Sequence, residues 1–231
     1  MRDDICTIPV SEVFEHNDGC PICRMRDTIE ERMTDYILGD AMMEPDVRIE
    51  TNKTGFCEHH YNNMMSRRGR LQLALMLQTH INEINGEIFK KKLFNTDSKK
   101  TGNAKNITDS CFICSKIEWG LSRMIETVYR CYETQKDFRD MFNLQSMFCL
   151  PHYERLLGGA SKRNMKSYYP EFSENLNRIT GEYSKSLYDD LSKYCTMYDY
   201  RSRGGETDWG NSRDAVERTV AFLNGRIYKE E

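Results

Sequence analysis

A pattern of cysteine and histidine that occurs twice constrains this 231-residue chain more than any other feature. Each copy holds a Cys-x2-Cys pair and a Cys-x2-His pair, with 33 intervening residues in the first copy and 34 in the second. Matching positions are offset by 91 or 92 residues, and the phenylalanine and tyrosine that flank the Cys-x2-His pairs repeat as well. This agreement indicates an internal duplication. The positions are Cys20, Cys23, Cys57 and His60 in the first copy and Cys111, Cys114, Cys149 and His152 in the second.

These residue types at this spacing are typical of a structural zinc site. A Cys-x2-Cys pair at a helix start brings two sulfurs within about 4 Å of each other, and a Cys-x2-His pair does the same for a sulfur and an imidazole nitrogen. Four such ligands close a tetrahedron and leave no position for a substrate. The amino-terminal end of a helix also favours the thiolate form of cysteine. We therefore predict two Zn²⁺ ions as cofactors, each held by the four ligands of one copy.

The first copy contains two adjacent histidines, and the repeat selects between them. His152 of the second copy aligns with His60, whereas Pro151 aligns with His59. We therefore predict that His60 is the ligand.

Other uses of the cysteines stay open at this stage. A disulfide within each Cys-x2-Cys pair leaves the Cys-x2-His pairs unexplained. A [4Fe–4S] cluster accepts this ligand set, so an iron–sulfur or thiol-based redox sensor is the alternative function. The first pair, with Pro21 after Cys20, is similar to the Cys-Pro-x-Cys of glutaredoxin-like oxidoreductases. Their βαβ pattern is missing here, however, and Phe112 replaces the proline in the second copy.

Hydrophobic periodicity predicts an all-α fold of two duplicated metal-binding halves packed together, with a short C-terminal helix. Only 5 prolines and 14 glycines interrupt the chain, which suits long helices. The strongest stripe recurs every three or four residues between Leu176 and Tyr198. We expect helices over residues 8–16, 20–39, 57–68, 70–94, 111–132, 149–159, 170–198 and 212–225. We expect loops over residues 40–56 and around Asn143.

The repeat also predicts the domain boundaries. Residues 1–94 form the first repeat, and residues 111–200 form the second. The polar segment 95–110 is expected to be a linker, and residues 201–231 to be the C-terminal helix and tail. The stripe after Arg70 is weaker than the stripe up to Tyr198. We therefore expect the first half to depend more on its metal.

Charge and composition exclude several classes of partner. The formal net charge of −3 disfavours a nucleic-acid-binding protein. No apolar run approaches the length of a membrane span, and the N-terminus lacks the apolar segment of a secretory signal. Nine cysteines in a chain that is expected to lack a secretory signal indicate metal or redox chemistry in the cytoplasm. Metal ions and an unidentified protein are the partners expected.

The remaining cysteines and histidines are expected to be structural. Cys131 and Cys195 lie within amphipathic segments and are predicted to be small buried side chains. His16 and His80 have no companion ligands nearby in the sequence. We expect them on the surface or hydrogen-bonded in the core.

The chain resembles an uncharacterised family of bacterial helical proteins that carry tandem Cys-x2-Cys … Phe-Cys-x2-His modules. The resemblance runs from Ile5 to about Gly225 and rests on the eight candidate ligands. It implies a helical fold and metal binding, but no established activity. With closed metal sites and no motif of an active site, a non-enzymatic interaction or regulatory module is the favoured function, although an active site in a cleft between the halves stays open.

Overall fold

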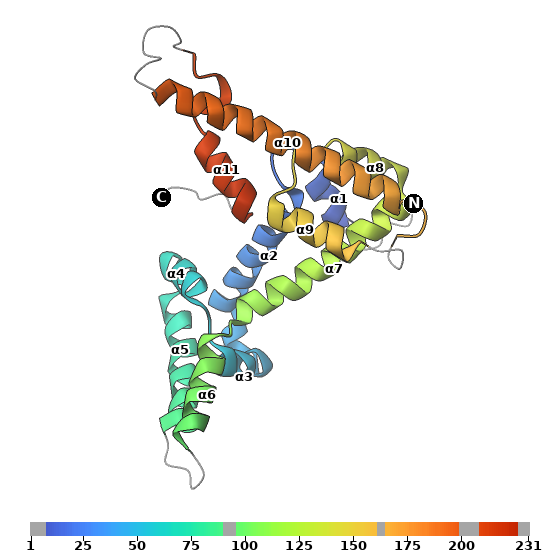
Figure 1. Ribbon diagram of the computed structural model, residues 1–231. Helices are drawn as coiled ribbons and strands as arrows, with labels where there is room; N and C mark the ends of the chain where they lie inside the picture. Colours follow the sequence, from blue (N-terminus) through green and yellow to red (C-terminus); the bar gives the residue numbers. More distant parts are fainter. Residues whose placement is uncertain (1–7, 90–95, 161–164, 199–207, 226–231) are drawn as a thin grey trace. The chain divides into compact units, whose positions relative to one another are not determined.

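The computed structural model of the protein describes residues 8–89, 96–160, 165–198 and 208–225 (Figure 1). All regular elements in these ranges are helices, and none of the described residues lies in a β-strand. The predicted all-α class is therefore confirmed. No helix in the described part of the chain combines the length and apolarity that crossing a bilayer requires.

The chain divides into two compact units, and each takes residues from both copies of the sequence pattern. Unit 1 consists of Met1–Met25 and Ser122–Glu231, and unit 2 consists of Arg26–Leu121. The boundaries fall inside two helices, α2 (Pro21–Leu38) and α7 (Phe112–Thr134). The domain boundaries predicted from the repeat, at residues 94, 110 and 200, stay a prediction.

Unit 1 is built around aromatic side chains. Phe142 lies at the centre, with ring centroids 5.1 Å from Tyr132 and Phe172, 4.9 Å from Phe148 and 5.7 Å from Phe14. Helix α9 packs against α10 and α11, and α1 packs against α8. Besides parts of α2 and α7, the elements are α1 (Ile8–Phe14), α8 (Lys136–Asn143), α9 (Leu150–Gly159), α10 (Tyr169–Tyr198), the short 3₁₀ helix η4 (Gly210–Ser212) and α11 (Ala215–Asn224).

Unit 2 has a smaller core of mostly aliphatic side chains and methionines. Helix α3 packs against α5, and α6 packs against α3 and η2. Besides parts of α2 and α7, the elements are η1 (Asp40–Met43), α3 (Pro45–Thr54), α4 (Glu58–Ser66), α5 (Arg70–Ile84), the π-helical turn η2 (Asn85–Phe89) and α6 (Asp97–Thr108). The core comprises Ile37, Leu38, Ala41, Phe56, Met64, Leu73, Met76, Phe112 and Ile113.

Three segments that were expected to be irregular are helical, which corrects the prediction. The loop predicted over residues 40–56 holds η1 and α3, and α3 begins with Pro45 in its first turn. The segment up to Asn143 is helix α8, and the expected loop follows it over residues 144–149. The linker 95–110 contains α6. Helix α6 starts at an N-cap, Thr96, whose hydroxyl accepts a hydrogen bond from the N–H of Lys99, and it buries no side chain. A helix without a buried face leaves no hydrophobic period in the sequence.

The sequence predicts that Leu71 and Leu75 begin the buried stripe of the helix after Arg70, but the structure buries a different face. Leu71 is exposed, whereas Leu73, Met76 and His80 are buried. The regular α-helix ends at Ile84 and continues as η2, and the predicted end near residue 94 lies outside the described residues. The predicted end of the last helix is confirmed, since α11 stops at Gly225 in a left-handed conformation with φ 68°.

Candidate metal centres

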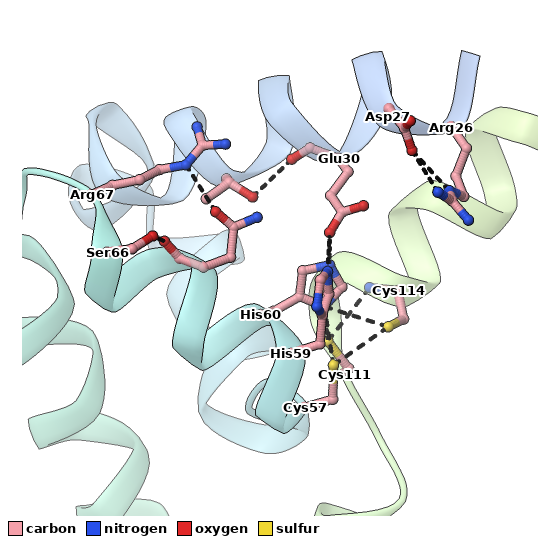
Figure 2. Close-up of polar contacts among 12 residues, drawn as sticks. Arg26, Asp27, Glu30, Cys57, His59, His60, Ser66, Arg67, Cys111 and Cys114 are labelled. Carbon is pink, nitrogen blue, oxygen red and sulfur yellow. Dashed lines mark hydrogen bonds and ion pairs between the residues drawn. The ribbon is translucent and has the colours of Figure 1, made fainter. Parts of the chain in front are cut away.

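The eight predicted ligands come together in two clusters, and each cluster combines pairs from both copies of the pattern. Within each cluster the possible ligand atoms all lie within 4.8 Å of one another. This contradicts the predicted pairing, in which each copy forms its own site. Site 1, in unit 1, consists of Cys20, Cys23, Cys149 and His152. Site 2, in unit 2, consists of Cys57, His60, Cys111 and Cys114 (Figure 2).

Helices α2 and α7 explain the exchanged pairing. Cys20 directly precedes α2, and the chain reaches Cys57 only after the 18 residues of α2 and two further helices. Each helical residue advances the chain by about 1.5 Å, so α2 carries it away from the first Cys-x2-Cys pair. Helix α7 does the same after Cys111. The partner of each pair is therefore a pair from the other copy.

Local helix geometry positions each Cys-x2-His pair. Cys149 and Cys57 are the N-caps of α9 and α4, and neither side chain caps its helix by a hydrogen bond. The first helical turn then brings the histidine three residues later beside the thiol. The Sγ to Nδ1 distance is 3.1 Å both for Cys149 and His152 and for Cys57 and His60.

Site 1 is enclosed by protein. Cys23 Sγ lies 3.6 Å from Cys149 Sγ and 3.3 Å from His152 Nδ1, while Cys20 Sγ lies 3.6 Å from the same nitrogen. Cys20, Cys149 and His152 are buried, and Cys23 is partly buried. The carbonyl oxygen of Gly225, at the end of α11, lies 3.1 Å from Cys23 Sγ.

Site 2 is open on one side. His60 is buried and its Nδ1 lies 3.3 Å from Cys111 Sγ and 3.5 Å from Cys114 Sγ. Cys57 Sγ lies 3.8 Å from Cys114 Sγ. The backbone N–H of Cys114 donates to Cys111 Sγ at 3.5 Å. Cys57 and Cys111 are partly buried, whereas Cys114 is exposed.

Both clusters have the dimensions of a tetrahedral metal site. Around a zinc ion, metal–sulfur bonds of about 2.3 Å and metal–nitrogen bonds of about 2.0 Å place two sulfurs about 3.8 Å apart and a sulfur and a nitrogen about 3.6 Å apart. The sulfur–sulfur distances of 3.6 and 3.8 Å are close to this value. They are far longer than a disulfide bond, and all eight cysteines that the structure describes are free.

A carboxylate contacts the imidazole of His60 in site 2, at the ring nitrogen that does not face the thiols (Figure 2). Glu30, on α2, has its Oε1 3.3 Å from His60 Nε2 and 2.6 Å from His59 Nε2. The contact between Glu30 Oε1 and His60 Nε2 does not meet the geometry of a regular hydrogen bond. Contact with His60 lowers the pKa of Glu30 to about 2, with a further contribution from His59 against the effect of burial. His59 thus faces the carboxylate, and His60 Nδ1 faces the thiols.

The thiols within each site compete for ionisation. Burial opposes ionisation of Cys111, but the interaction with His60 and the backbone N–H of Cys114 lower its pKa to about 6. The pKa of Cys114 is raised by partial desolvation of its thiol and by the neighbouring charge of Cys111. In site 1, burial opposes ionisation of Cys20, but the thiols of Cys149 and Cys23 and the imidazole of His152 lower its pKa. The pKa of Cys23 is raised by the thiols of Cys149 and Cys20 and by burial. A bound cation offsets this repulsion and allows all three thiolates of a site to coexist.

Among the described residues, Cys131, Cys195, His16 and His80 lie outside both clusters. Cys131 is buried as predicted, but Cys195 is exposed, so that prediction is wrong for Cys195. His80 is buried and its Nδ1 lies 2.7 Å from the carbonyl oxygen of Asn52, as expected of a satisfied core histidine. His16 is exposed.

Sequence reasoning missed two residues at these sites, Glu30 and Gly225. Glu30 carries no motif, because its carboxylate reaches His60 from a different helix. Gly225 was predicted only as the end of a helix. Its contact with Cys23 depends on where α11 packs.

One comparison with known proteins identifies a relationship. No curated protein and no solved structure matches the chain. A family model described as a family of unknown function, DUF6062, matches residues 1–230. This match spans almost the whole chain and includes both Cys and His clusters, and it confirms the resemblance to an uncharacterised helical family. The chain therefore belongs to the family of unknown function DUF6062.

Proposed function

We propose that the protein binds two structural zinc ions, one in site 1 and one in site 2, and serves as a non-enzymatic interaction or regulatory module. The observation that carries this proposal is the convergence of three thiols and one imidazole in each cluster, with all ligand atoms within 4.8 Å. Cysteine and histidine are the ligands that zinc prefers in structural sites.

The spacing of the ligands favours a single ion over an iron–sulfur cluster. A [4Fe–4S] cluster presents four separate iron atoms, one to each protein ligand, so its ligands stand farther apart than those around one ion. In both sites all ligand atoms lie within 4.8 Å of one another, near the spacing of about 3.6–3.8 Å around a single tetrahedral ion. This supports zinc and makes the redox cluster the alternative outcome of the test.

Four protein ligands also argue against metal-based catalysis. Catalytic zinc keeps a coordination position for water or substrate, with three protein ligands. Each cluster here supplies four. The role of the metal is then to hold helices together, and the reduced thiols that this requires are typical of the cytoplasm.

Purified protein tests the proposal directly. We expect elemental analysis to find two zinc ions per chain and a colourless solution, because Zn²⁺ has a filled d shell. Iron together with sulfide and a brown colour support the redox alternative instead. A metal-free protein that keeps its helical content and binds no added zinc contradicts both.

Glu30 is expected to orient His60 for binding through Nδ1. Metal-bound histidines commonly donate their other N–H to a carboxylate, and loss of that partner lowers metal affinity by about 10–100-fold. Glu30→Ala should lower the zinc affinity of site 2 by this amount and leave site 1 unchanged. Glu30→Gln keeps an acceptor oxygen and should restore part of the affinity.

The affinities are measured by competition with a chromogenic chelator, and the thiols that are freed are alkylated and mapped by mass spectrometry. Asp35→Ala is the matched control, because Asp35 lies on the same helix and pairs with Arg67 away from the metal ligands. Equal weakening of both sites in Glu30→Ala, or the same loss in Asp35→Ala, shows that Glu30 does not position His60.

A further inference from the structure

We propose that Cys57 and Cys114 of site 2 form an oxidation site, at which a peroxide produces a disulfide and zinc leaves, while site 1 keeps its ion. This inference rests on the proposed zinc binding and adds a reactivity to one site. It is carried by two observations, the unequal exposure of the two sites and the distance between these two sulfurs.

The two sites differ in how far their cysteines are exposed to solvent. Cys114 is the exposed member of the eight candidate ligands. An oxidant in solution therefore has access to this residue. Thiolates that are accessible are oxidised first, whereas buried ones are protected.

Site 1 lacks a comparable opening. Cys20 and Cys149 have 7% and 1% of their surface exposed. The backbone of Gly225 covers the partly buried Cys23, with its carbonyl oxygen 3.1 Å from that sulfur. Gly225 packs closely on the site, because a Cβ atom added to it would lie 3.1 Å from Cys149 Sγ and 3.8 Å from Cys23 Sγ.

The geometry of site 2 provides a second thiol for the reaction. Cys57 Sγ lies 3.8 Å from Cys114 Sγ; Cys57 directly precedes α4, whereas Cys114 lies in α7. A bond between them needs the sulfurs to approach to about 2.05 Å. Cys57 is an N-cap and Cys114 lies in the first turn of α7, so both stand at helix ends, where small shifts are easiest.

The reaction takes two steps and balances with hydrogen peroxide as the oxidant. The thiolate of Cys114 attacks the O–O bond, which breaks to give a sulfenic acid and hydroxide. The thiolate of Cys57 then attacks the oxidised sulfur, forms the disulfide and expels a second hydroxide. Two electrons pass from the sulfurs to the peroxide. Zinc loses two of its four ligands and is released, with Cys111 and His60 left behind.

The experiment uses the full-length, zinc-loaded chain with Cys195→Ser, because Cys195 is exposed and belongs to neither site. Hydrogen peroxide is added in the presence of a chromogenic zinc chelator. We expect half of the bound zinc to be released in a fast phase and the other half in a much slower one. Peptide mapping after the fast phase should find Cys57 joined to Cys114.

A substitution that keeps the metal separates oxidation from loss of fold. Cys114→His retains a zinc ligand at the exposed position but cannot form the disulfide. This variant should bind two zinc ions and lose the fast phase. Release of both ions in one phase, a first disulfide at Cys20 or Cys23, or an unchanged fast phase in Cys114→His overturns the inference. Absence of zinc from the starting protein contradicts the proposed function instead, so the two failures are distinguishable.

Discussion

Replacement of Cys23 and Cys149 together by serine should leave one zinc ion per chain, whereas replacement of Cys23 and Cys57 together should leave none. Cys23 and Cys149 belong to one cluster, so the first double variant damages site 1 alone. Cys23 and Cys57 belong to different clusters, so the second damages both. A hydroxyl is a poor substitute for a thiolate, and three remaining ligands hold zinc much more weakly.

The two double variants remove the same number of cysteines, which makes them matched controls for each other. Cys195→Ala is a further control and should keep two zinc ions, because Cys195 lies outside both clusters. Zinc is measured by elemental analysis after gel filtration. If each repeat instead formed its own site, the result would be reversed, with no zinc in the Cys23/Cys149 variant and one ion in the Cys23/Cys57 variant.

Removal of zinc is expected to unfold unit 2 before unit 1. A ligand at 1,000 times its dissociation constant stabilises the folded state by about 4 kcal/mol. Removal of zinc by a chelator therefore lowers the free energy of unfolding of each unit by this amount. Unit 1 retains the aromatic packing around Phe142. Unit 2 has a smaller core, and its helix α6 buries no side chain. The same loss is therefore a larger fraction of the stability of unit 2.

Hydrogen exchange after addition of a chelator measures this difference. Peptides from residues 26–89 should lose protection before peptides from residues 122–160 and 165–198. Lowering the pH should act in the same direction, because protons compete with zinc for thiolate and imidazole. Simultaneous loss of protection in both sets of peptides shows that the chain unfolds as one cooperative unit and contradicts the prediction.

The pairing of the ligands changes which part of the chain is expected to depend on metal. The sequence repeat assigns residues 1–94 to one site and residues 111–200 to the other. In the structure, Cys111 and Cys114 at the start of α7 complete the site of unit 2, and Cys20 and Cys23 complete that of unit 1. The weaker sequence stripe after Arg70 still lies in the part that is expected to depend more on metal, but the ligands of that part come from both copies.

Helices with one buried face were predictable, and helices without one were not. The stripe between Leu176 and Tyr198 predicts α10 because Leu176, Ile179 and Leu187 are buried at helical spacing. Helix α3 buries a single residue, Thr51, and α6 buries none. Helix α8 buries Phe138 and Phe142, four residues apart, but with eight residues it is too short to establish a period.

The sequence by itself determined the eight candidate ligands and the local geometry of each pair, because a spacing of three residues at a helix start places two side chains together whatever the rest of the chain does. The tertiary structure decided which pairs meet. All four pairs are chemically able to combine, and only the paths of α2 and α7 bring Cys20 and Cys23 to His152, and Cys111 and Cys114 to His60. Packing likewise placed Glu30 behind His60 and Gly225 over Cys23. These contacts join residues that are far apart in the sequence, so no short-range spacing of residues predicts them.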